Sequence, residues 1–293
     1  MIKKDWLRFW ASGLIWSTSF LWIKIAVSEV SPLVLVDFRA SFAALGMLLI
    51  ILLTRSQRIP WQRLRRWLGF YALLGFINVA VPFVLISWGE QYISSGIASV
   101  LNSTTPLFAV MLTTFLLPED RLNLTKLIGL LVGFAGVVVL FLPELKGGVV
   151  MDMLSMAAVL IASLFYAISG IFIKRKGQGL PSEYQVLLQF TFAAIITWAL
   201  TLFFERPVHL PQLPLTWAAL LWLGLLGSSL ASLFYFQLIH SAGPTRATMV
   251  TYIPPLVGLI LGAIILNEEL SWWTLVGGVM ILAGIITVSK PKR

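Results

Sequence analysis

The sequence contains no cysteine and only two histidines among its 293 residues. The absence of cysteine excludes disulfide bonds, thiolate catalysis and thiolate-ligated metal. His209 and His240 stand near the ends of apolar segments, with no second ligand at a metal-binding spacing. A phosphate-binding loop is also missing, and no spacing assembles a serine, a histidine and an aspartate into a catalytic triad. We therefore expect no cofactor, no bound metal and no enzymatic activity.

Charged side chains are scarce as well. They make up 11% of the residues, against about 25% in soluble proteins, while 59% are hydrophobic and the mean hydropathy is +0.93. Apolar runs of roughly 18–22 residues recur along the whole chain, each long enough to cross a hydrocarbon core of about 30 Å. The fold class that follows is an all-α integral membrane protein. The net charge of +9 is concentrated beside these runs, which indicates contact with anionic membrane lipids rather than nucleic acid.

The apolar runs divide into ten predicted transmembrane helices. Their ranges are 7–27, 33–53, 67–88, 96–117, 125–142, 151–173, 183–204, 215–238, 246–266 and 272–289. With the first residue in the cytoplasm, 17 of the 21 lysines and arginines fall in cytoplasmic segments; the exceptions are Lys24, Arg39, Lys146 and Arg206. Basic residues favour the cytoplasmic side of a membrane. We therefore expect a multi-pass protein of the cell inner (plasma) membrane with both termini in the cytoplasm.

The second half of the chain repeats the first. Residues 98–119 align with residues 247–268 at a constant offset of 149, and the next helix follows at an offset of 148. The matched pairs are Ala98 with Ala247, Pro106 with Pro255, Leu107 with Leu256, Glu119 with Glu268, Gly129 with Gly277 and Gly136 with Gly284. We predict a first five-helix repeat at 1–142, a linker at 143–150 and a second five-helix repeat at 151–293. Because five is odd, the two repeats would be inverted relative to each other, which is typical of transporters.

Several short motifs resemble those of a known family. The run Trp16-Ser17-Thr18-Ser19-Phe20 resembles the W-G-S-N-F motif of the drug/metabolite transporter (DMT) superfamily, EamA type, with Ser17 in place of the usual glycine. Arg39, Thr105-Pro106-Leu107 and Pro255-Leu256 are similar to further positions of that family. The resemblance covers nearly the whole chain. It implies ten helices around a central cavity and transport of small metabolites, often their export.

Asp37 is the one acidic residue in the interior of a predicted span, since the other acidic residues fall in loops or at span ends. Lys24 and Arg39 are basic neighbours near the outer ends of the first two spans, and Glu90 falls at the outer end of the third. Charged residues within a membrane often serve gating or ion coupling, so Asp37, Lys24 and Arg39 form a candidate gate or coupling site. A pair between Asp37 and Lys24 would fit this role. The alternative is a structural ion pair, or basic side chains that reach the membrane surface.

Uncharged polar and aromatic residues gather near the middle of several spans. The candidate substrate-binding residues are Trp16, Ser19, Asn78, Asn102, Tyr166, Tyr235 and Tyr252. Inverted-repeat transporters bind their solute at this depth. Without a charged group there, the cavity would favour a neutral, zwitterionic or aromatic metabolite such as an amino acid. The alternative is that these side chains only bond or pack against neighbouring helices.

Two other classes of function remain open. An integral membrane enzyme or lipid-handling protein would need acids, bases or metal ligands near one membrane face, and a passive channel would need a continuous pore. The inverted repeat and its prolines favour a transporter that works by alternating access. Gly129-x-x-x-Gly133 and Gly258-x-x-x-Gly262 allow close packing of helices. We expect the protein to be a monomer or a weak homodimer. Its expected binding partner is a small-molecule solute.

Overall fold

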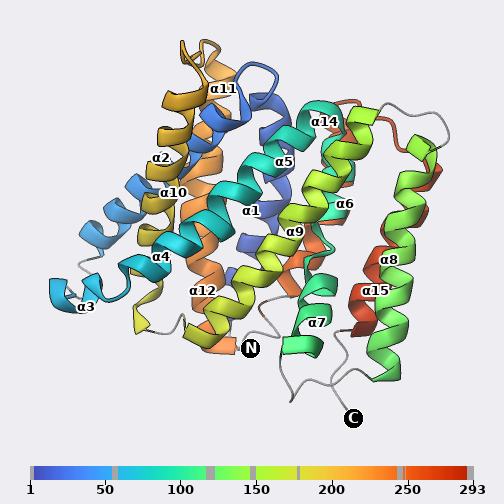
Figure 1. The fold of residues 1–293 in the computed structure, drawn as a ribbon, viewed down its shortest axis with the longest axis horizontal. Helices are drawn as coiled ribbons and strands as arrows, with labels where there is room; N and C mark the ends of the chain where they lie inside the picture. Colours follow the sequence, from blue (N-terminus) through green and yellow to red (C-terminus); the bar gives the residue numbers. More distant parts are fainter. Residues whose placement is uncertain are drawn as a thin grey trace.

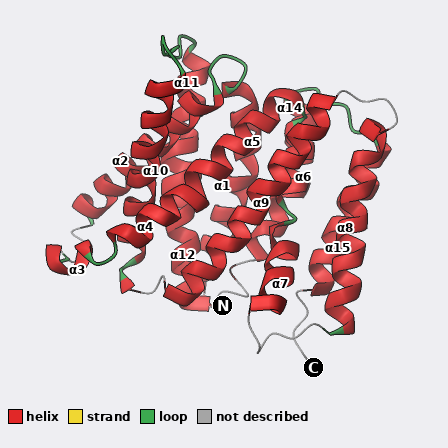
Figure 2. Ribbon diagram, in the orientation of Figure 1, coloured by secondary structure: helices red, strands yellow, loops and turns green. Residues whose placement is uncertain are grey.

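A computed structural model describes most of the chain. The described residues are 3–54, 59–116, 123–145, 150–176, 179–242, 247 and 249–288. Every regular element within these ranges is a helix, as Figure 2 shows, so the predicted all-α fold is confirmed for them. Glu119 and residues 146–149 of the predicted linker 143–150 lie outside the described residues.

The helices follow one another with short connections. In the first half they are α1 (Lys3–Ala26), α2 (Pro32–Leu53), α3 (Trp61–Arg65), α4 (Leu68–Leu74), the π-helix η1 (Gly75–Ala80), α5 (Val81–Tyr92), α6 (Ser95–Asn102), α7 (Thr105–Leu116) and α8 (Leu124–Leu145). In the second half they are α9 (Val150–Lys176), α10 (Ser182–Phe204), α11 (Pro214–Leu221), the π-helix η3 (Trp222–Leu230), α12 (Ala231–Ala242), the 3₁₀-helix η4 (Met249–Tyr252), α14 (Ile253–Ile265) and α15 (Trp272–Val288).

Local sequence explains where several helices begin. The Ser31 hydroxyl accepts a hydrogen bond of 3.2 Å from the Val34 N–H and caps α2. Ser94 does the same for α6 through the Ile97 N–H. Such caps satisfy backbone N–H groups that have no partner inside the helix. Prolines stand in the first turns of α2, α11 and α14, where the missing N–H is harmless.

Seven helical segments are long and apolar enough to cross a membrane. They begin at residues 32, 68, 95, 124, 150, 182 and 214, and two shorter apolar helices cover 249–265 and 272–288. The chain is therefore an integral membrane protein. The serine- and tryptophan-rich α1 is 24 residues long but is not one of the seven, so the count of ten spans stays a prediction.

The third and fourth spans of each half are irregular in the middle. The third span passes through a π-helix in both halves, η1 in the first and η3 in the second. The fourth span breaks between Asn102 and Thr105 in the first half, and in the second half the 3₁₀-helix η4 comes directly before the α-helix that starts at Ile253. These irregularities fall at corresponding repeat positions. Broken helices and π-helices frequently mark binding sites in transporters.

The two halves pack against each other through matched pairs of helices. α2 lies against α10, α6 against α14 and α8 against α15, while α1 against α12 mirrors α9 against α5. Figure 1 shows α8 and α15 as a pair at one edge of the bundle. There a Cβ added to Gly136 would lie 2.7 Å from the Gly277 carbonyl oxygen. Only glycine permits such a close approach of two backbones.

The two ends of the bundle differ in charge. The loops 27–31, 205–213 and 266–271 lie at one end, beside α11 and α14 in Figure 1, and contain Glu29, Glu205, Arg206, Glu268 and Glu269. We call this the acidic end. The opposite, basic end contains the start of α1 and the short α3, and its described charged residues are Lys3, Lys4, Asp5, Arg8, Arg63, Arg65, Arg66, Lys126, Arg175 and Glu183.

Candidate functional site

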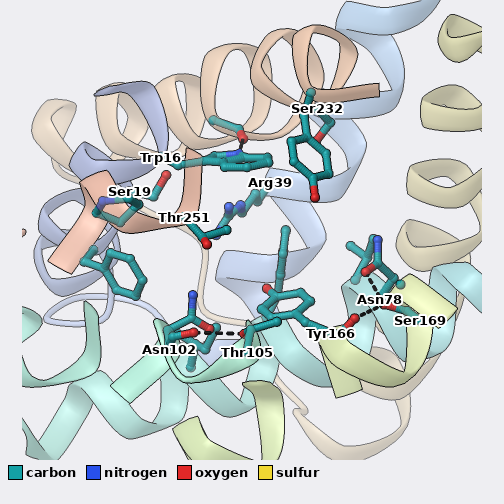
Figure 3. A pocket seen from close by; sticks show the side chains of 18 of the residues that line it. Trp16, Ser19, Arg39, Asn78, Asn102, Thr105, Tyr166, Ser169, Ser232 and Thr251 are labelled. Carbon is teal, nitrogen blue, oxygen red and sulfur yellow. Dashed lines mark hydrogen bonds between the residues drawn. The ribbon is translucent and has the colours of Figure 1, made fainter. Parts of the chain in front are cut away.

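A cavity of about 240 Å³ lies between the two halves of the chain. Its walls come from α1, α2, the η1–α5 span and α6 of the first half, and from α9, α10, the η3–α12 span and the η4–α14 span of the second. The irregular segments of the third and fourth spans thus contribute to the wall in both halves. We call this space the central cavity; Figure 3 shows the side chains that line it.

Six of the seven candidate substrate-binding residues line the central cavity. They are Trp16, Ser19, Asn78, Asn102, Tyr166 and Tyr235. Tyr252 is not among the lining residues, and Thr251 and Pro254 line the cavity in its place. Thr251 lies in the 3₁₀-helix η4 and Pro254 in the first turn of α14; the two are three positions apart and share a face of the span. Whether these residues bind a solute stays a prediction.

Trp16 connects α1 to the irregular third span of the second half. Its indole Nε1 donates a hydrogen bond of 3.0 Å to the Gly227 carbonyl oxygen in η3. Its ring lies 5.0 Å from the Tyr235 ring, centroid to centroid, at an interplanar angle of 56°. With its N–H bonded to protein, Trp16 offers the cavity an aromatic surface rather than a hydrogen-bond donor.

Asn78 is bonded on both sides of its amide. Its Nδ2 donates to the Gln189 Oε1 at 3.1 Å, and its Oδ1 accepts from the Ser169 hydroxyl at 2.6 Å. The residue therefore joins η1 to α10 and α9, which gives it a structural role as well as a place in the cavity wall. The sequence prediction missed Gln189 and Ser169. Gln189 could have been found by the signal that identified Asn78, an amide side chain inside a predicted span: Gln189 lies in the span 183–204 and Asn78 in the span 67–88.

Asn102 lies where the fourth span of the first half breaks. Its backbone carbonyl accepts hydrogen bonds from the Thr105 and Ser163 hydroxyls at 2.9 and 3.3 Å, and its Oδ1 accepts weakly from Ser163 at 3.5 Å. Its side-chain nitrogen has no hydrogen-bond partner within the described part of the chain. The half-buried amide can therefore bond a solute without first losing a strong internal hydrogen bond.

Arg39 brings a positive charge into the central cavity. The side chain is 5% exposed, its Nε donates to the Ser228 hydroxyl at 2.8 Å, and its guanidinium carbon lies 3.8 Å from the centroid of the Phe83 ring. No acidic residue of the described ranges forms an ion pair with it. The expectation of a cavity without charge is therefore wrong. Depth along α2 was a poor guide, because a long arginine side chain reaches inward from the backbone position.

Asp37 is buried and Lys24 half-buried, but the two side chains do not form an ion pair with each other. Asp37 is 0% exposed, faces α10 and accepts a hydrogen bond of 2.6 Å from the Thr201 hydroxyl. The Lys24 ammonium instead donates to the backbone carbonyls of Glu90 and Ile93 at 2.6 and 2.8 Å. Neither residue lines the central cavity. The three gate candidates are thus separated, and only Arg39 faces the space where a solute would sit.

A bundle of apolar helices in two matching halves, with a polar and aromatic cavity between them, is the architecture of a membrane transporter. The chain belongs to the EamA-like transporter family, whose family model matches residues 7–142 and 153–290. The names of its relatives point to transport rather than to catalysis.

Curated relatives cover almost the full chain. A protein of Archaeoglobus fulgidus, named an uncharacterized transporter, is 28% identical over 99% of this chain and 100% of its own length. The Escherichia coli K12 protein YedA, named an uncharacterized inner membrane transporter, is 27% identical over 94% of this chain and 88% of its own. A solved crystal structure with 17% identity and a TM-score of 0.69, covering 98% of both chains, shares the fold.

Proposed function

We propose that this transporter carries a small organic solute with a carboxylate group, an amino acid with an apolar or aromatic side chain, across the cell inner membrane. The observation that carries the proposal is the Arg39 guanidinium, which is buried at the central cavity without an ion pair among the described residues. A guanidinium has five N–H donors, and within the described part of the chain only the Nε donor of Arg39 has a hydrogen-bond partner, Ser228. The remaining donors are open to a solute.

Electrostatics narrows the chemistry of that solute. A buried cation without a partner costs several kcal/mol. A carboxylate matches the planar fork of arginine with two parallel hydrogen bonds. A solute without an anionic group would not offset the free-energy cost of burying the Arg39 cation. Of the neutral, zwitterionic and aromatic solutes that the sequence favoured, those with a carboxylate therefore fit best.

The rest of the cavity wall suits the other parts of an amino acid. Trp16, Phe20, Phe83 and Tyr235 offer aromatic surface to an apolar side chain. The Asn102 carboxamide adds a hydrogen-bonding group that can accept from an ammonium. A zwitterion placed in this way would have its charges opposite groups that can bond both.

The symmetry of the irregular segments supports alternating access as the mechanism. Each half contributes a π-helix in its third span and an interruption in its fourth, all of them at the cavity wall. Such segments can bend at lower cost than continuous helices, so the halves could rock around a fixed site. The basic end would face the cytoplasm, where basic loops are favoured.

Solute exchange in proteoliposomes tests the proposal. Vesicles preloaded with L-phenylalanine should accumulate labelled L-phenylalanine by counterflow. 3-Phenylpropanoate, which keeps the carboxylate, should compete, whereas 2-phenylethylamine, which lacks it, should not. Arg39→Gln should weaken uptake by at least roughly 30-fold, since removing one partner of a buried charge pair costs about 2–5 kcal/mol. Arg206→Gln, at an exposed site on the acidic end, is the matched control. Equal competition by the amine and the acid would overturn the proposal.

A further inference from the structure

Glu90 is a buried acid that the transport site leaves unexplained. It lies in the last turn of α5, is 0% exposed, and neither of its carboxylate oxygens has a hydrogen-bond partner within the described part of the chain. The sequence places Glu90 at the outer end of the third predicted span. Asp37, the other acid buried within a span, accepts a hydrogen bond from Thr201. Glu90 is therefore the less satisfied of the two.

The charged groups that act on Glu90 come from three other elements. They are Lys24 of α1, Arg39 of α2 and Glu268 of the loop after α14. Lys24 forms no ion pair with the Glu90 side chain, because its ammonium donates to the Glu90 and Ile93 backbone carbonyls. From α9, the neighbours of the preceding residue, Gly89, are Ser155 and Val159, which carry no charge.

Glu268 is held in a different way from Glu90. Its Oε1 accepts from the Ser95 N–H at 2.7 Å, and its Oε2 accepts from the Ser95 hydroxyl at 3.0 Å and the Gly96 N–H at 3.1 Å. Its negative charge thus sits at the N-terminus of α6, where the helix dipole stabilises it. We call the connection between α5 and α6 the α5–α6 corner (residues 90–96). Lys24 donates hydrogen bonds to its first part, at Glu90 and Ile93, and Glu268 accepts hydrogen bonds from its last part, at Ser95 and Gly96.

The α5–α6 corner separates the central cavity from the acidic end. Ile86, one helical turn before Glu90, lines the cavity, and so does Ser99, one turn after Ser95. Glu90 therefore lies between the cavity and the water at the acidic end. With the corner in its present position, that water does not reach the side chain, which is fully buried.

We propose that Glu90 is a proton-binding site of the transport cycle. A buried carboxylate without hydrogen-bond donors costs far more free energy than the neutral acid, so the side chain holds a proton while the α5–α6 corner is closed. Once the corner opens toward the acidic end, water solvates the carboxylate and the carboxyl oxygen gives its proton to that water. When the central cavity next to the corner instead opens toward the basic end, the carboxylate takes a proton from the water there. One full cycle then moves one proton from the basic end to the acidic end. The proposal rests on the proposed function only in linking this proton to a solute.

Infrared spectroscopy tests the site without any solute. Purified wild-type protein at neutral pH should show the C=O stretching band of a protonated carboxylic acid, and Glu90→Gln should lack it. Glu269→Gln changes an exposed acid at the same end and should keep the band. Should Glu90→Gln fail to fold, Glu90→Asp keeps the carboxyl group and should shift the band instead. An unchanged spectrum in the Glu90 variant, or a band lost in Asp37→Asn instead, would overturn the proposal.

Proton movement in vesicles tests the link to transport. Wild-type proteoliposomes with a trapped pH-sensitive dye should show a pH change when L-phenylalanine is added outside. Glu90→Gln should abolish the pH change and keep L-phenylalanine counterflow, because exchange needs no net proton movement. A pH change of wild-type size in Glu90→Gln would refute the coupling role. Absence of wild-type counterflow would instead refute the proposed solute, and the infrared result would still decide the proton site.

Discussion

Two charged residues of α2 that stand only two positions apart have different environments. Successive helix residues are rotated by about 100°, so residues two apart point to different sides. Asp37 faces α10 and bonds Thr201, whereas Arg39 faces the central cavity and bonds Ser228. Ser228 orients the guanidinium by accepting from Nε, which leaves the terminal nitrogens of Arg39 toward the cavity. A hydroxyl that does not itself bind the solute can thus set how well the arginine does.

Ser228→Ala tests this orienting role. Loss of a hydrogen bond to a charged group should weaken L-phenylalanine counterflow by roughly 1.5 kcal/mol, or about tenfold, with little change in thermal stability. Ser229→Ala is the matched control, since this neighbouring buried hydroxyl has no hydrogen-bond partner within the described residues. Equal losses of uptake in both variants would mean that any change in η3 disturbs the cavity, and that Ser228 has no special part in it.

The two asparagines of the cavity should separate stability from transport. Asn78→Ala removes two hydrogen bonds to Gln189 and Ser169 and should destabilise the detergent-solubilised protein by about 1–3 kcal/mol in thermal or denaturant unfolding. Asn102→Ala removes only a weak internal contact, so it should leave stability unchanged and weaken counterflow. Reversed behaviour of the two variants would contradict the hydrogen-bond pattern on which this prediction depends.

The sequence predicted the residues of the cavity better than their roles. Amide side chains inside apolar runs are costly to expose to lipid, and this cost identified Asn78 and Asn102. Trp16 was identified by its position in the middle of a span rather than at a membrane interface. The partners of those residues come from other helices, so Gln189 and Gly227 could not be assigned to them from the sequence. Arg39 was predicted as part of a gate near the outer end of its span, not as a cavity residue. The position of its backbone along the helix does not show where its long side chain ends.

At the scale of helices, the sequence predicted the spans and missed their interruptions. Apolar length defines a span, but a π-helix has the same composition as the α-helix around it, so η1 and η3 left no signal. The break before Thr105 did have one, since Pro106 cannot donate the hydrogen bond that a continuous helix would require. The α5–α6 corner was also missed, because Lys24 and Glu268 reach it from distant parts of the chain.

The absence of native cysteine allows a direct test of the α5–α6 corner. A single cysteine at Ser99, which lines the cavity one turn beyond the corner, should react slowly with a membrane-impermeant maleimide added from the acidic end. Glu268→Gln removes the carboxylate that grips Ser95 and Gly96, so labelling of this cysteine should become faster. Glu269→Gln should not change the labelling rate. An unchanged rate in Glu268→Gln would mean that the grip does not hold the corner closed.

Glu29 joins the halves at the acidic end and should make their contact sensitive to acid. A hydrogen bond from Thr216 does most to lower the pKa of Glu29, and the N–H groups of Gln212 and Leu213 lower it further. A lowered pKa in the folded state means that the contact stabilises the protein above the usual glutamate range and is lost as pH falls through the lowered value. Glu29→Gln should therefore reduce thermal stability at pH 7. The difference from wild type should shrink toward pH 3, and a constant difference would contradict this account.

In the whole molecule, equivalent helices of the two halves pack against each other. The pairs α2–α10, α6–α14 and α8–α15 each join a helix to its own counterpart in the repeat. The central cavity lies where these pairs meet the irregular third spans, so neither half could form it alone. Internal similarity in the sequence was sufficient to predict this two-fold plan. The choice of partners was not readable from the sequence, since it depends on side-chain fits such as Gly136 against Gly277.

The charge difference between the two ends of the bundle predicts how the molecule sits in the membrane. Basic residues dominate the described part of one end and acidic residues the other, and basic loops are retained in the cytoplasm. In intact cells, a single cysteine at His209, exposed at the acidic end, should react with an impermeant maleimide. A cysteine at Gln62, exposed in α3 at the basic end, should react only after the membrane is opened. Reaction at Gln62 alone would reverse the orientation, and with it the side of the membrane to which Glu90 releases its proton. Reaction at both positions in intact cells would place both ends outside, which no arrangement of spans crossing between them allows.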